Sequence, residues 1–277
     1  MPELPEVETI ARGLAKRMEG RRIARLDLHR GDLRWKIPSG LKTKVEGRRV
    51  ERVERRAKYL LIRLEDHGVL LLHLGMSGRL VIIDPGSNAE LERHDHVVFH
   101  LEDGTHIRFN DARRFGMLDY VHADRLAQHR LLRELGPEPL GPDFTAERLA
   151  AALKGKRAPL KAALLDQQIV AGLGNIYVCE SLFYAGLSPR RLAGTITLER
   201  AERLVRAIRD VLKRAIAAGG SSLRDYVQAS GELGYFQQQW AVYGREGERC
   251  PGCDCKTGIR RIVQGGRSTF YCAKRQR

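Results

Sequence analysis

The chain begins with Met1-Pro2-Glu3-Leu4-Pro5-Glu6, which can place a reactive amine beside carboxylic acids. Removal of Met1 would leave Pro2 with a free secondary amine. An α-amino group has an ordinary pKa of about 7.7–8.0, so part of it is unprotonated and nucleophilic at neutral pH. Glu3 can then carry protons for the reaction that Pro2 starts. The start of the chain therefore predicts a catalytic site with an amine nucleophile.

A nucleophile at a chain end has to be fixed in space, and the residues that follow predict a helix that does this. Pro5 suits a first helical turn, and an apolar stripe on one helical face ends before Gly20. The stripe consists of Val7, Ile10, Ala11, Leu14 and Met18. The plainer interpretation, that the Pro-rich start only begins a helix, is compatible with the catalytic one.

The composition favours a polyanionic partner. The 277 residues contain 49 Lys+Arg against 34 Asp+Glu, a formal net charge of +15, and phosphate backbones are the commonest partner of such chains. A ribosomal or merely soluble basic protein shows the same totals. The distribution is more specific, because residues 245–277 hold nine Lys/Arg against three Asp/Glu beside a cysteine cluster.

No sequence signal points to a membrane. No apolar run approaches the roughly 18–20 residues of a membrane span, and no charged-then-apolar leader precedes the first predicted helix. We therefore expect a cytoplasmic protein.

Short β-strands separated by turns are expected over residues 21–121. The segments Asp66-His67-Gly68 and Glu102-Asp103-Gly104 are the clearest hairpin signals. The pattern is typical of an antiparallel β-sandwich. The expected strands are 22–28, 48–53, 59–64, 69–74, 79–83, 96–101, 106–109 and 117–121.

A Pro- and Gly-rich segment at 136–142 interrupts all periodicity, and the pattern beyond it is helical. We expect helices over 147–153, 160–168, 175–184 and 197–218, the last one closed by Gly219-Gly220. The fold class is therefore α+β, with an N-terminal helix and β-sandwich, then a helical domain that ends in a zinc-finger-like β-hairpin. The expected division is a catalytic domain at 1–135, a hinge at 136–145, a helical domain at 146–240 and the hairpin at 241–277.

Residues 166–177 join two predicted helices through a glycine-bearing double turn. The glycines let another backbone approach closely. The second helix points its N-terminal N–H groups, together with the Asn175 side chain, at an anion such as a phosphate. An ordinary helical hairpin explains the spacing equally well.

Four of the five cysteines cluster near the C-terminus, at Cys250, Cys253, Cys255 and Cys272. Cysteines around a short hairpin indicate a structural zinc site, because metal–thiolate bonds replace the core that so few residues cannot build. Three alternatives remain open. All four cysteines bind the ion together, a water completes a three-cysteine site, or the hairpin folds without metal. The fifth, Cys179, is expected to be a buried apolar residue.

The opening string Pro2 to Thr9 resembles the start of the formamidopyrimidine-DNA glycosylase family, bifunctional base-excision enzymes that remove oxidised purines. The resemblance runs from Pro2 to Arg277. It implies a monomer in the bacterial cytosol and nucleoid, and duplex DNA with oxidised bases or abasic sites as the partner. The double turn resembles the family's helix–two-turn–helix, in which the residues matching Asn175 and Lys161 bind DNA.

The resemblance also assigns roles in the strand-rich half. Lys58 matches an active-site lysine, and His73 is positioned for a phosphate. Met76, Arg113 and Phe115 match three residues that fill the gap left by an extruded base, where a thioether and a ring restore lost stacking. Singly, each has an ordinary explanation as a solvated lysine, a core residue or a solvated hairpin end.

The C-terminal hairpin resembles the family's zinc finger but departs from its pattern. The family has Cys-x-x-Cys, sixteen residues and a second Cys-x-x-Cys. Cys250 and Cys253 keep the spacing of the first pair, Cys255 stands at the family distance from Cys272, and Arg275 replaces the fourth cysteine. Arg267, at the hairpin tip, matches an arginine that grips the phosphates flanking the damaged nucleotide.

The mechanism that the resemblance implies starts with attack of Pro2 on C1′ of the sugar, which gives a Schiff base and then β- and δ-elimination. Glu3 transfers protons, Glu6 holds the terminus, and any zinc is structural. Ser221 and Ser222 match a loop that reads the flipped purine. Two alternatives are an endonuclease VIII-type glycosylase for oxidised pyrimidines, which Leu4 fits less well, and a non-catalytic DNA- or RNA-binding protein.

Overall fold

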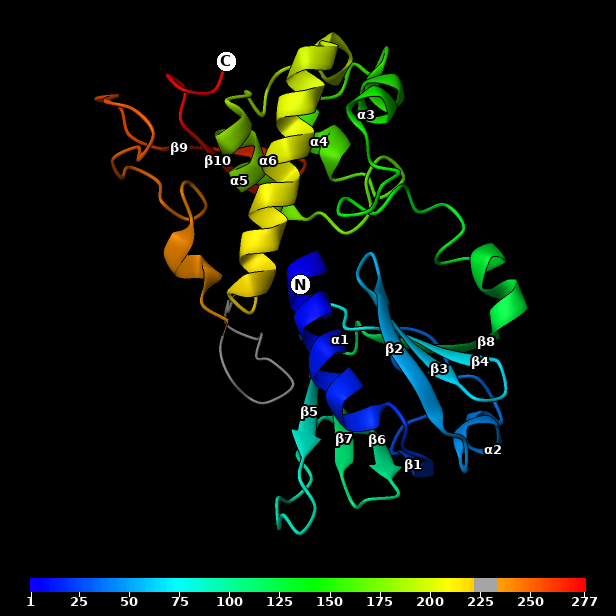
Figure 1. Cartoon of the computed structure of the whole chain (residues 1–277). Coiled ribbons are helices and arrows are strands. Elements are labelled where there is room, and N and C mark those ends of the chain that lie inside the picture. Colours follow the sequence, from blue (N-terminus) through cyan, green and yellow to red (C-terminus); the bar gives the residue numbers. More distant parts are fainter. Residues whose placement is uncertain (222–233) are drawn as a thin grey trace. The chain divides into compact units, whose positions relative to one another are not determined.

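The computed structural model describes residues 1–221 and 234–277, and the chain forms two compact units. Unit 1 contains residues 1–133 and 218–237, and unit 2 contains residues 134–217 and 238–277. Strands predominate in unit 1 and helices in unit 2 (Figure 1). The expected α+β class is confirmed.

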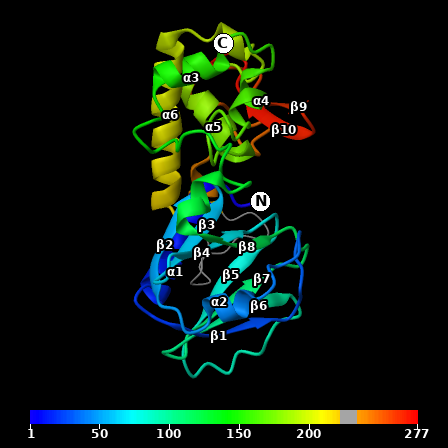
Figure 2. The same cartoon turned by 90° about the vertical axis from the view of Figure 1, so that its right-hand side faces the viewer.

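Unit 1 is a sandwich of two antiparallel sheets (Figure 2). Its strands are β1 (Ile23–Leu28), β2 (Val50–Arg56), β3 (Tyr59–Leu64), β4 (Gly68–His73), β5 (Arg79–Ile83), β6 (Asp95–Leu101), β7 (His106–Asn110) and β8 (Met117–His122). One sheet has the order β1-β6-β7-β5, and the other has the order β2-β3-β4-β8. All the expected strands form, and β2 extends furthest beyond its expected end.

One apolar core joins both sheets to helix α1 (Leu4–Met18). The expected stripe supplies Val7, Ile10 and Leu14 to this core, and the helix packs against β2 and β3. One face of α1 is buried and the other is exposed because apolar residues recur at helical spacing. The start of the chain is thus anchored to the sandwich. A short helix, α2 (Leu41–Val45), and a 3-10 helix, η1 (Ala123–Gln128), were not expected.

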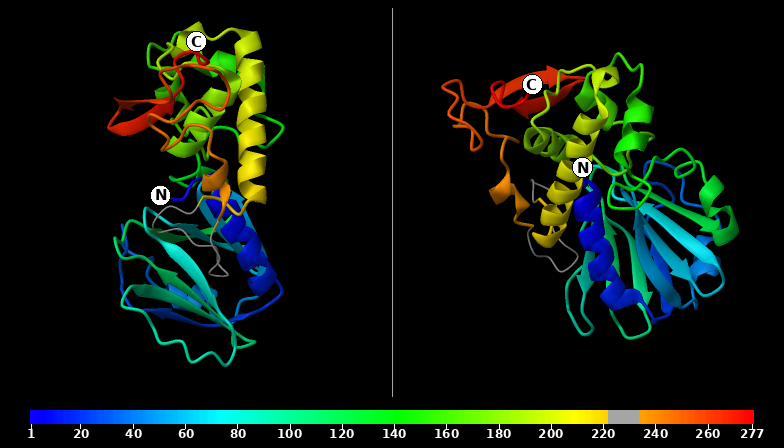
Figure 3. Two further views of the ribbon diagram at one scale, coloured as in Figure 1. Left: turned by 90° about the vertical axis from the view of Figure 1, so that its left-hand side faces the viewer. Right: turned by 45° about the horizontal axis from the view of Figure 1, so that its top comes forward.

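Unit 2 consists of helices and a C-terminal hairpin. The helices are α3 (Ala146–Leu153), α4 (Leu160–Leu164), α5 (Asn175–Ala185) and α6 (Leu198–Ala217), and the hairpin strands are β9 (Arg260–Gln264) and β10 (Arg267–Tyr271). Helix α6 packs against α3 and α5, and β10 packs against α5. The hairpin extends from the helices in Figure 3. Two further 3-10 helices are η2 (Ala193–Thr195) and η3 (Phe236–Gln239).

The helix expected over 160–168 is shorter, because α4 ends at Leu164. Polar side chains after Leu164 bond to nearby backbone and so compete with helical hydrogen bonds. Asp166 Oδ1 accepts from the Gln168 N–H at 3.0 Å, and Gln167 Nε2 donates to the Leu165 and Leu173 carbonyls. This correction places the double turn directly after a single short helix.

Helix α6 is strongly two-sided. Leu204, Ile208 and Leu212 on one face are fully buried, and the opposite face carries arginine and lysine. Among residues 1–221 and 234–277, no helix combines the length and the apolar character that crossing a lipid bilayer requires.

Candidate active site and metal centre

The N-terminal residues are held by the first turn of α1. Glu3 is the N-cap, and Glu3 and Glu6 form a capping box in which each side chain accepts a hydrogen bond from the backbone N–H of the other. The Glu6 Oε2 to Glu3 N distance is 2.9 Å. Both carboxylates are buried, with 4% and 2% of their surfaces exposed. Pro2 is half-buried directly before this cap, so the chain start has a fixed position within unit 1.

The second oxygen of Glu6 connects the chain start to a distant segment. Glu6 Oε1 accepts a hydrogen bond from the Ser221 backbone N–H at 2.8 Å, and Ser221 is 3% exposed. The structure therefore brings Glu3, Glu6 and Ser221 together in unit 1. Ser222 lies outside the described residues.

Lys58 and His73 lie at neighbouring strand ends. Lys58 follows Ala57, which has a φ of +52°, in the tight turn between β2 and β3. Lys58 is only 7% exposed, so the ordinary explanation of a solvated lysine does not apply. His73 ends β4 opposite Tyr59, with ring centroids 4.9 Å apart.

His73 is an uncharged donor at neutral pH. Burial, together with the nearby charges of Lys58, Arg34 and the chain N-terminus, lowers the pKa of His73 to about 4. His73 Nδ1 accepts from the Gly75 N–H at 3.0 Å, which leaves the proton of the neutral ring on Nε2. Lys58, Arg34 and the chain N-terminus therefore all lie near His73.

The three residues expected to fill a base-sized gap lie on two loops that pack together. Met76 is 39% exposed and Phe115 is 41% exposed, so both large apolar side chains are accessible. The Arg113 guanidinium lies 5.0 Å from the centre of the Phe115 ring. Gly75 has a φ of +64°, and a Cβ there would lie 2.3 Å from the Phe115 carbonyl carbon. Only glycine permits this contact between the loops.

Asp111 fixes the same two loops, and sequence reasoning missed it. Its buried carboxylate accepts from Ser77 Oγ at 2.7 Å and from the Gly116 N–H at 2.7 Å. Ser77 Oγ in turn accepts from the Arg113 N–H at 3.2 Å. A short acid beside glycine and arginine in a loop was the available signal.

In unit 2, Asn175 and Lys161 both reach the first residues of β10. Asn175 Nδ2 donates to the Ser268 carbonyl at 2.9 Å and to the Tyr243 hydroxyl at 3.2 Å. Lys161 is fully buried, and its Nζ donates to Thr269 Oγ1 at 2.7 Å and to the Ser268 carbonyl at 3.2 Å. Both residues are therefore tied to the strand that begins with Arg267.

Arg267 stands exposed at the tip of the hairpin. It pairs with Gln264 across a two-residue turn of Gly265 and Gly266, which have φ values of +55° and +72°. Two glycines with positive φ form the turn that matches the twist of a tight hairpin. The Arg267 side chain is thereby presented to the surroundings of unit 2.

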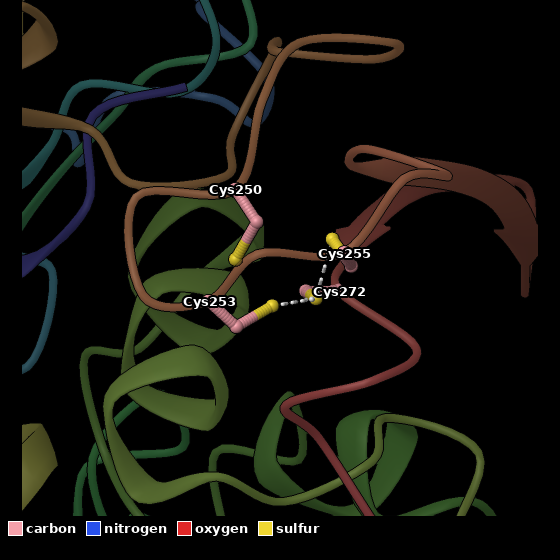
Figure 4. A group of neighbouring side chains, drawn as sticks. All are labelled: Cys250, Cys253, Cys255 and Cys272. Carbon is pink, nitrogen blue, oxygen red and sulfur yellow. Dashed lines mark hydrogen bonds between the residues drawn. The ribbon is translucent and has the colours of Figure 1, made fainter.

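The four clustered cysteines converge on one point (Figure 4). Their sulfur atoms all lie within 4.8 Å of one another, and Cys272 Sγ is 3.5 Å from those of Cys253 and Cys255. Zinc–thiolate bonds of about 2.3 Å in a tetrahedron need sulfurs about this far apart. The residues therefore fit a metal ion with all four cysteines as ligands, the first of the three alternatives above.

The pKa values of the clustered thiols differ. Burial raises the pKa of Cys250 to about 12 and raises that of Cys255, whereas hydrogen bonds from the Arg275 backbone and the neighbouring thiols outweigh burial and lower the pKa of Cys272 to about 7. Arg275, which replaces the fourth family cysteine, turns to α5. Its guanidinium lies 4.9 Å from the Phe183 ring and donates to the Phe183 and Gly252 carbonyls at 3.3 and 3.1 Å. The charged Arg275 guanidinium therefore interacts with the Phe183 ring and with these two carbonyls.

A second buried acid, Glu180, was also missed by sequence reasoning. It is fully buried within the apolar helix α5, and it accepts from three successive backbone N–H groups, at Ala241, Val242 and Tyr243. Burial raises the pKa of Glu180, and the three amide hydrogen bonds oppose this rise. A glutamate inside an otherwise apolar helix was the signal that something polar meets it there.

Family models match most of the chain. The N-terminal domain of formamidopyrimidine-DNA glycosylase matches residues 1–118, and the H2TH domain of the same enzyme matches residues 135–227. The formamidopyrimidine-DNA glycosylase of Paracoccus denitrificans is 58% identical, with 98% of each chain covered. That of Rhodospirillum centenum is 57% identical, with 100% of each chain covered.

Solved structures agree with these matches. The MutM (Fpg) protein of Thermus thermophilus is 42% identical with a TM-score of 0.87, over 99% of this chain and 98% of that one. A Lactococcus lactis Fpg mutant in complex with DNA containing Fapy-dG is 34% identical with a TM-score of 0.89, over 100% of both chains. The chain belongs to the formamidopyrimidine-DNA glycosylase family.

Proposed function

We propose that this protein is a bifunctional DNA glycosylase and abasic-site lyase of base excision repair that removes oxidised purines, such as 8-oxoguanine and formamidopyrimidines, from duplex DNA. The observation that carries the proposal is the buried capping box of Glu3 and Glu6, which fixes the Pro2 backbone and also binds Ser221. Lactococcus lactis Fpg has been solved with DNA that contains Fapy-dG and with DNA that contains an abasic site. The enzyme would act as a monomer in the bacterial cytoplasm.

The first chemical step requires a mature chain that begins at Pro2. The Pro2 nitrogen donates its lone pair to C1′, the bond from C1′ to the base nitrogen breaks, and the base leaves with the electron pair and takes up the proton that the Pro2 nitrogen loses. Glu3 protonates the sugar ring oxygen as the ring opens, which leaves an iminium between Pro2 and C1′. Glu6 keeps Glu3 and the terminus in place.

The iminium makes the C2′ proton acidic, and its removal expels the 3′ phosphate. A second elimination expels the 5′ phosphate, so a one-nucleotide gap remains. Lys58 contributes a buried positive charge near the chain start and contacts the DNA backbone or the lesion. The step needs no redox cofactor and no metal as reactant.

The remaining proposed roles concern DNA. His73, Asn175 and Arg267 bind phosphates, the first as a neutral Nε2–H donor, and the buried Lys161 supports DNA binding by holding the start of β10. Met76 and Phe115 occupy the space of the extruded base, and Arg113 hydrogen-bonds the orphaned partner. Ser221 and Ser222 read the flipped base. Four thiolates, from Cys250, Cys253, Cys255 and Cys272, hold a structural Zn²⁺ that stabilises the hairpin carrying Arg267.

Borohydride trapping tests the central step. Sodium borohydride reduces an imine to a stable amine, so the wild-type protein should become covalently attached to duplex DNA that contains 8-oxoguanine. Pro2→Gly should lose almost all of this product, whereas the exposed Pro85→Gly should keep it. Peptide mapping should find the adduct on Pro2. A wild-type protein that binds DNA but never cross-links would be a binding module, and preferential trapping on thymine glycol would indicate the pyrimidine-specific alternative.

A further inference from the structure

Helix α5 carries two polar residues with different surroundings. Asn175 is its first residue and faces the start of β10, whereas Glu180 lies one and a half turns later inside the core. At about 1.5 Å per residue, the two are separated by roughly 7.5 Å along the helix axis. One segment, residues 241–243, contacts both of them.

The contact with Glu180 uses backbone groups only. Glu180 Oε2 accepts from the Ala241 N–H at 2.8 Å, and Oε1 accepts from the Val242 and Tyr243 N–H groups at 3.0 and 2.9 Å. Successive N–H groups that converge on one carboxylate form an anion nest, which fixes the backbone of the donors. Three such bonds, away from water, anchor the segment that leads into the cysteine hairpin.

The contact with Asn175 uses the Tyr243 side chain. Its ring lies between Trp240 and Phe270, with centroid distances of 5.1 Å to each, and its hydroxyl accepts from Asn175 Nδ2 at 3.2 Å. The second Nδ2 proton goes to the Ser268 carbonyl at 2.9 Å. Because that carbonyl can only accept, the amide orientation of Asn175 is fixed, with its donors toward β10.

We infer that Glu180 is a positioning residue for DNA binding: it fixes the backbone of residues 241–243, and so places the Tyr243 hydroxyl that, together with the Ser268 carbonyl, holds the Asn175 amide in place before DNA arrives. The inference rests on the proposed phosphate contact of Asn175. A phosphate oxygen replaces the longer of the two Nδ2 bonds, the one to Tyr243, while the bond to Ser268 holds the amide. Glu180 acts through other residues and touches no reacting group.

The expected size of the effect follows from preorganisation. An unrestrained side chain loses about 0.5–1.5 kcal/mol when binding immobilises it, and a tenfold change in affinity corresponds to about 1.4 kcal/mol. Glu180→Gln keeps the shape but turns an N–H donor toward one of the three amide donors. It should weaken DNA binding about fivefold. Asn175→Ala removes the phosphate contact itself and should weaken binding about tenfold or more.

A double-mutant cycle separates positioning from a general loss of structure. Affinity is measured by fluorescence anisotropy on a duplex with a tetrahydrofuran abasic-site analogue, using full-length, zinc-loaded wild type, Glu180→Gln, Asn175→Ala and the double variant. We expect Glu180→Gln to cost about fivefold when Asn175 is present and less than about twofold in the Asn175→Ala background. The matched control is Glu202→Gln, the same change at an exposed position of α6. In the same cycle it should show no coupling to Asn175→Ala.

One further variant and one measurement separate positioning from poor folding of Glu180→Gln. Tyr243→Phe removes only the hydroxyl that joins the segment to Asn175, and its effect should also shrink in the Asn175→Ala background. Hydrogen exchange at residues 241–243 should accelerate in Glu180→Gln, while zinc content and protection of α6 are unchanged.

The possible failures are distinguishable. If Asn175→Ala binds DNA as well as the wild type does, the proposed phosphate contact fails, and the positioning role fails with it. If Asn175→Ala weakens binding but Glu180→Gln does not, or if the two effects add, the contact stands and the positioning role is wrong.

Discussion

We assign catalysis to the start of the chain and DNA binding to the cysteine hairpin. Different forces hold these two regions in place. Pro2 and Glu3 are fixed by a capping box on a helix whose apolar stripe joins the sandwich core. The hairpin has only a small apolar cluster, around Cys250, Phe270 and Cys272, and four sulfurs that converge. A side chain at the chain start can therefore be substituted so that only its chemical role is lost. Substitution of a cysteine ligand in the hairpin also disrupts the local structure.

The largest effect is expected from Glu3→Gln. It removes the proton donor but keeps a side-chain oxygen that can cap α1, so single-turnover base excision should fall by about 10²–10⁴-fold with little change in stability. The exposed Glu51→Gln on β2 is the matched control and should retain full activity. If Glu3→Gln loses thermal stability together with its activity, the chain start does not differ from the hairpin in this way.

Removal of the metal tests the other side of the comparison. Chelation, or Cys255→Ser, should weaken DNA binding by about 10–100-fold and raise hydrogen exchange over residues 250–272, while exchange in α1 and the sandwich stays slow. Cys179→Ser, in α5 and outside the sulfur cluster, should keep one zinc ion per chain. Full zinc content in Cys255→Ser would instead support a three-cysteine site completed by water.

A moderate effect is expected from Phe115→Ala. Loss of one stacking ring costs about 1–2 kcal/mol, so kcat/KM on lesion DNA should fall about tenfold. Leu91→Ala, another exposed apolar residue of unit 1, serves as the control. The effect should shrink on DNA in which the lesion lies opposite an abasic site, because no orphaned base then needs support. An undiminished effect there would argue against gap filling.

The smallest effect concerns the pH dependence of stability, which tests the lowered pKa of His73. Its folded-state pKa of about 4 lies below the ordinary 6.5, so the unfolded chain binds the proton more readily. The stability that neutral His73 contributes is present above pH 6.5 and is lost as the pH falls toward 4. Relative to His73→Gln, the wild type should lose about 1 kcal/mol over this range, after allowance for partial exposure. Parallel stability curves from chemical denaturation would refute the lowered pKa.

Much of the fold could be predicted because periodicity is a local property. Turn residues and alternating apolar positions located the sandwich strands, and α5 and α6 begin and end within one residue of expectation. The helix over 160–168 was too long because side chains such as Gln167 bond to the backbone, which periodicity does not register.

The site was less predictable because its residues come from segments that are distant in the sequence and meet only in the folded chain. The residues at the chain start predicted Pro2 and Glu3, and family resemblance added Lys58, but Asp111 and Glu180 have no separate motif and gain their partners only when distant segments meet. The same holds for the cysteines. Spacing left the ligand set open, and the positions of the sulfur atoms are what favour all four.

The contact of Gly75 with the Phe115 backbone has a mechanical consequence. Since Ser77 and Asp111 tie the same two loops, Met76 and Phe115 are held as one preassembled unit, and in the role that we propose for them they would enter a double helix together. The entropy of ordering this unit is lost when the polypeptide folds, so on this proposal no further ordering of the two loops is needed at each base pair.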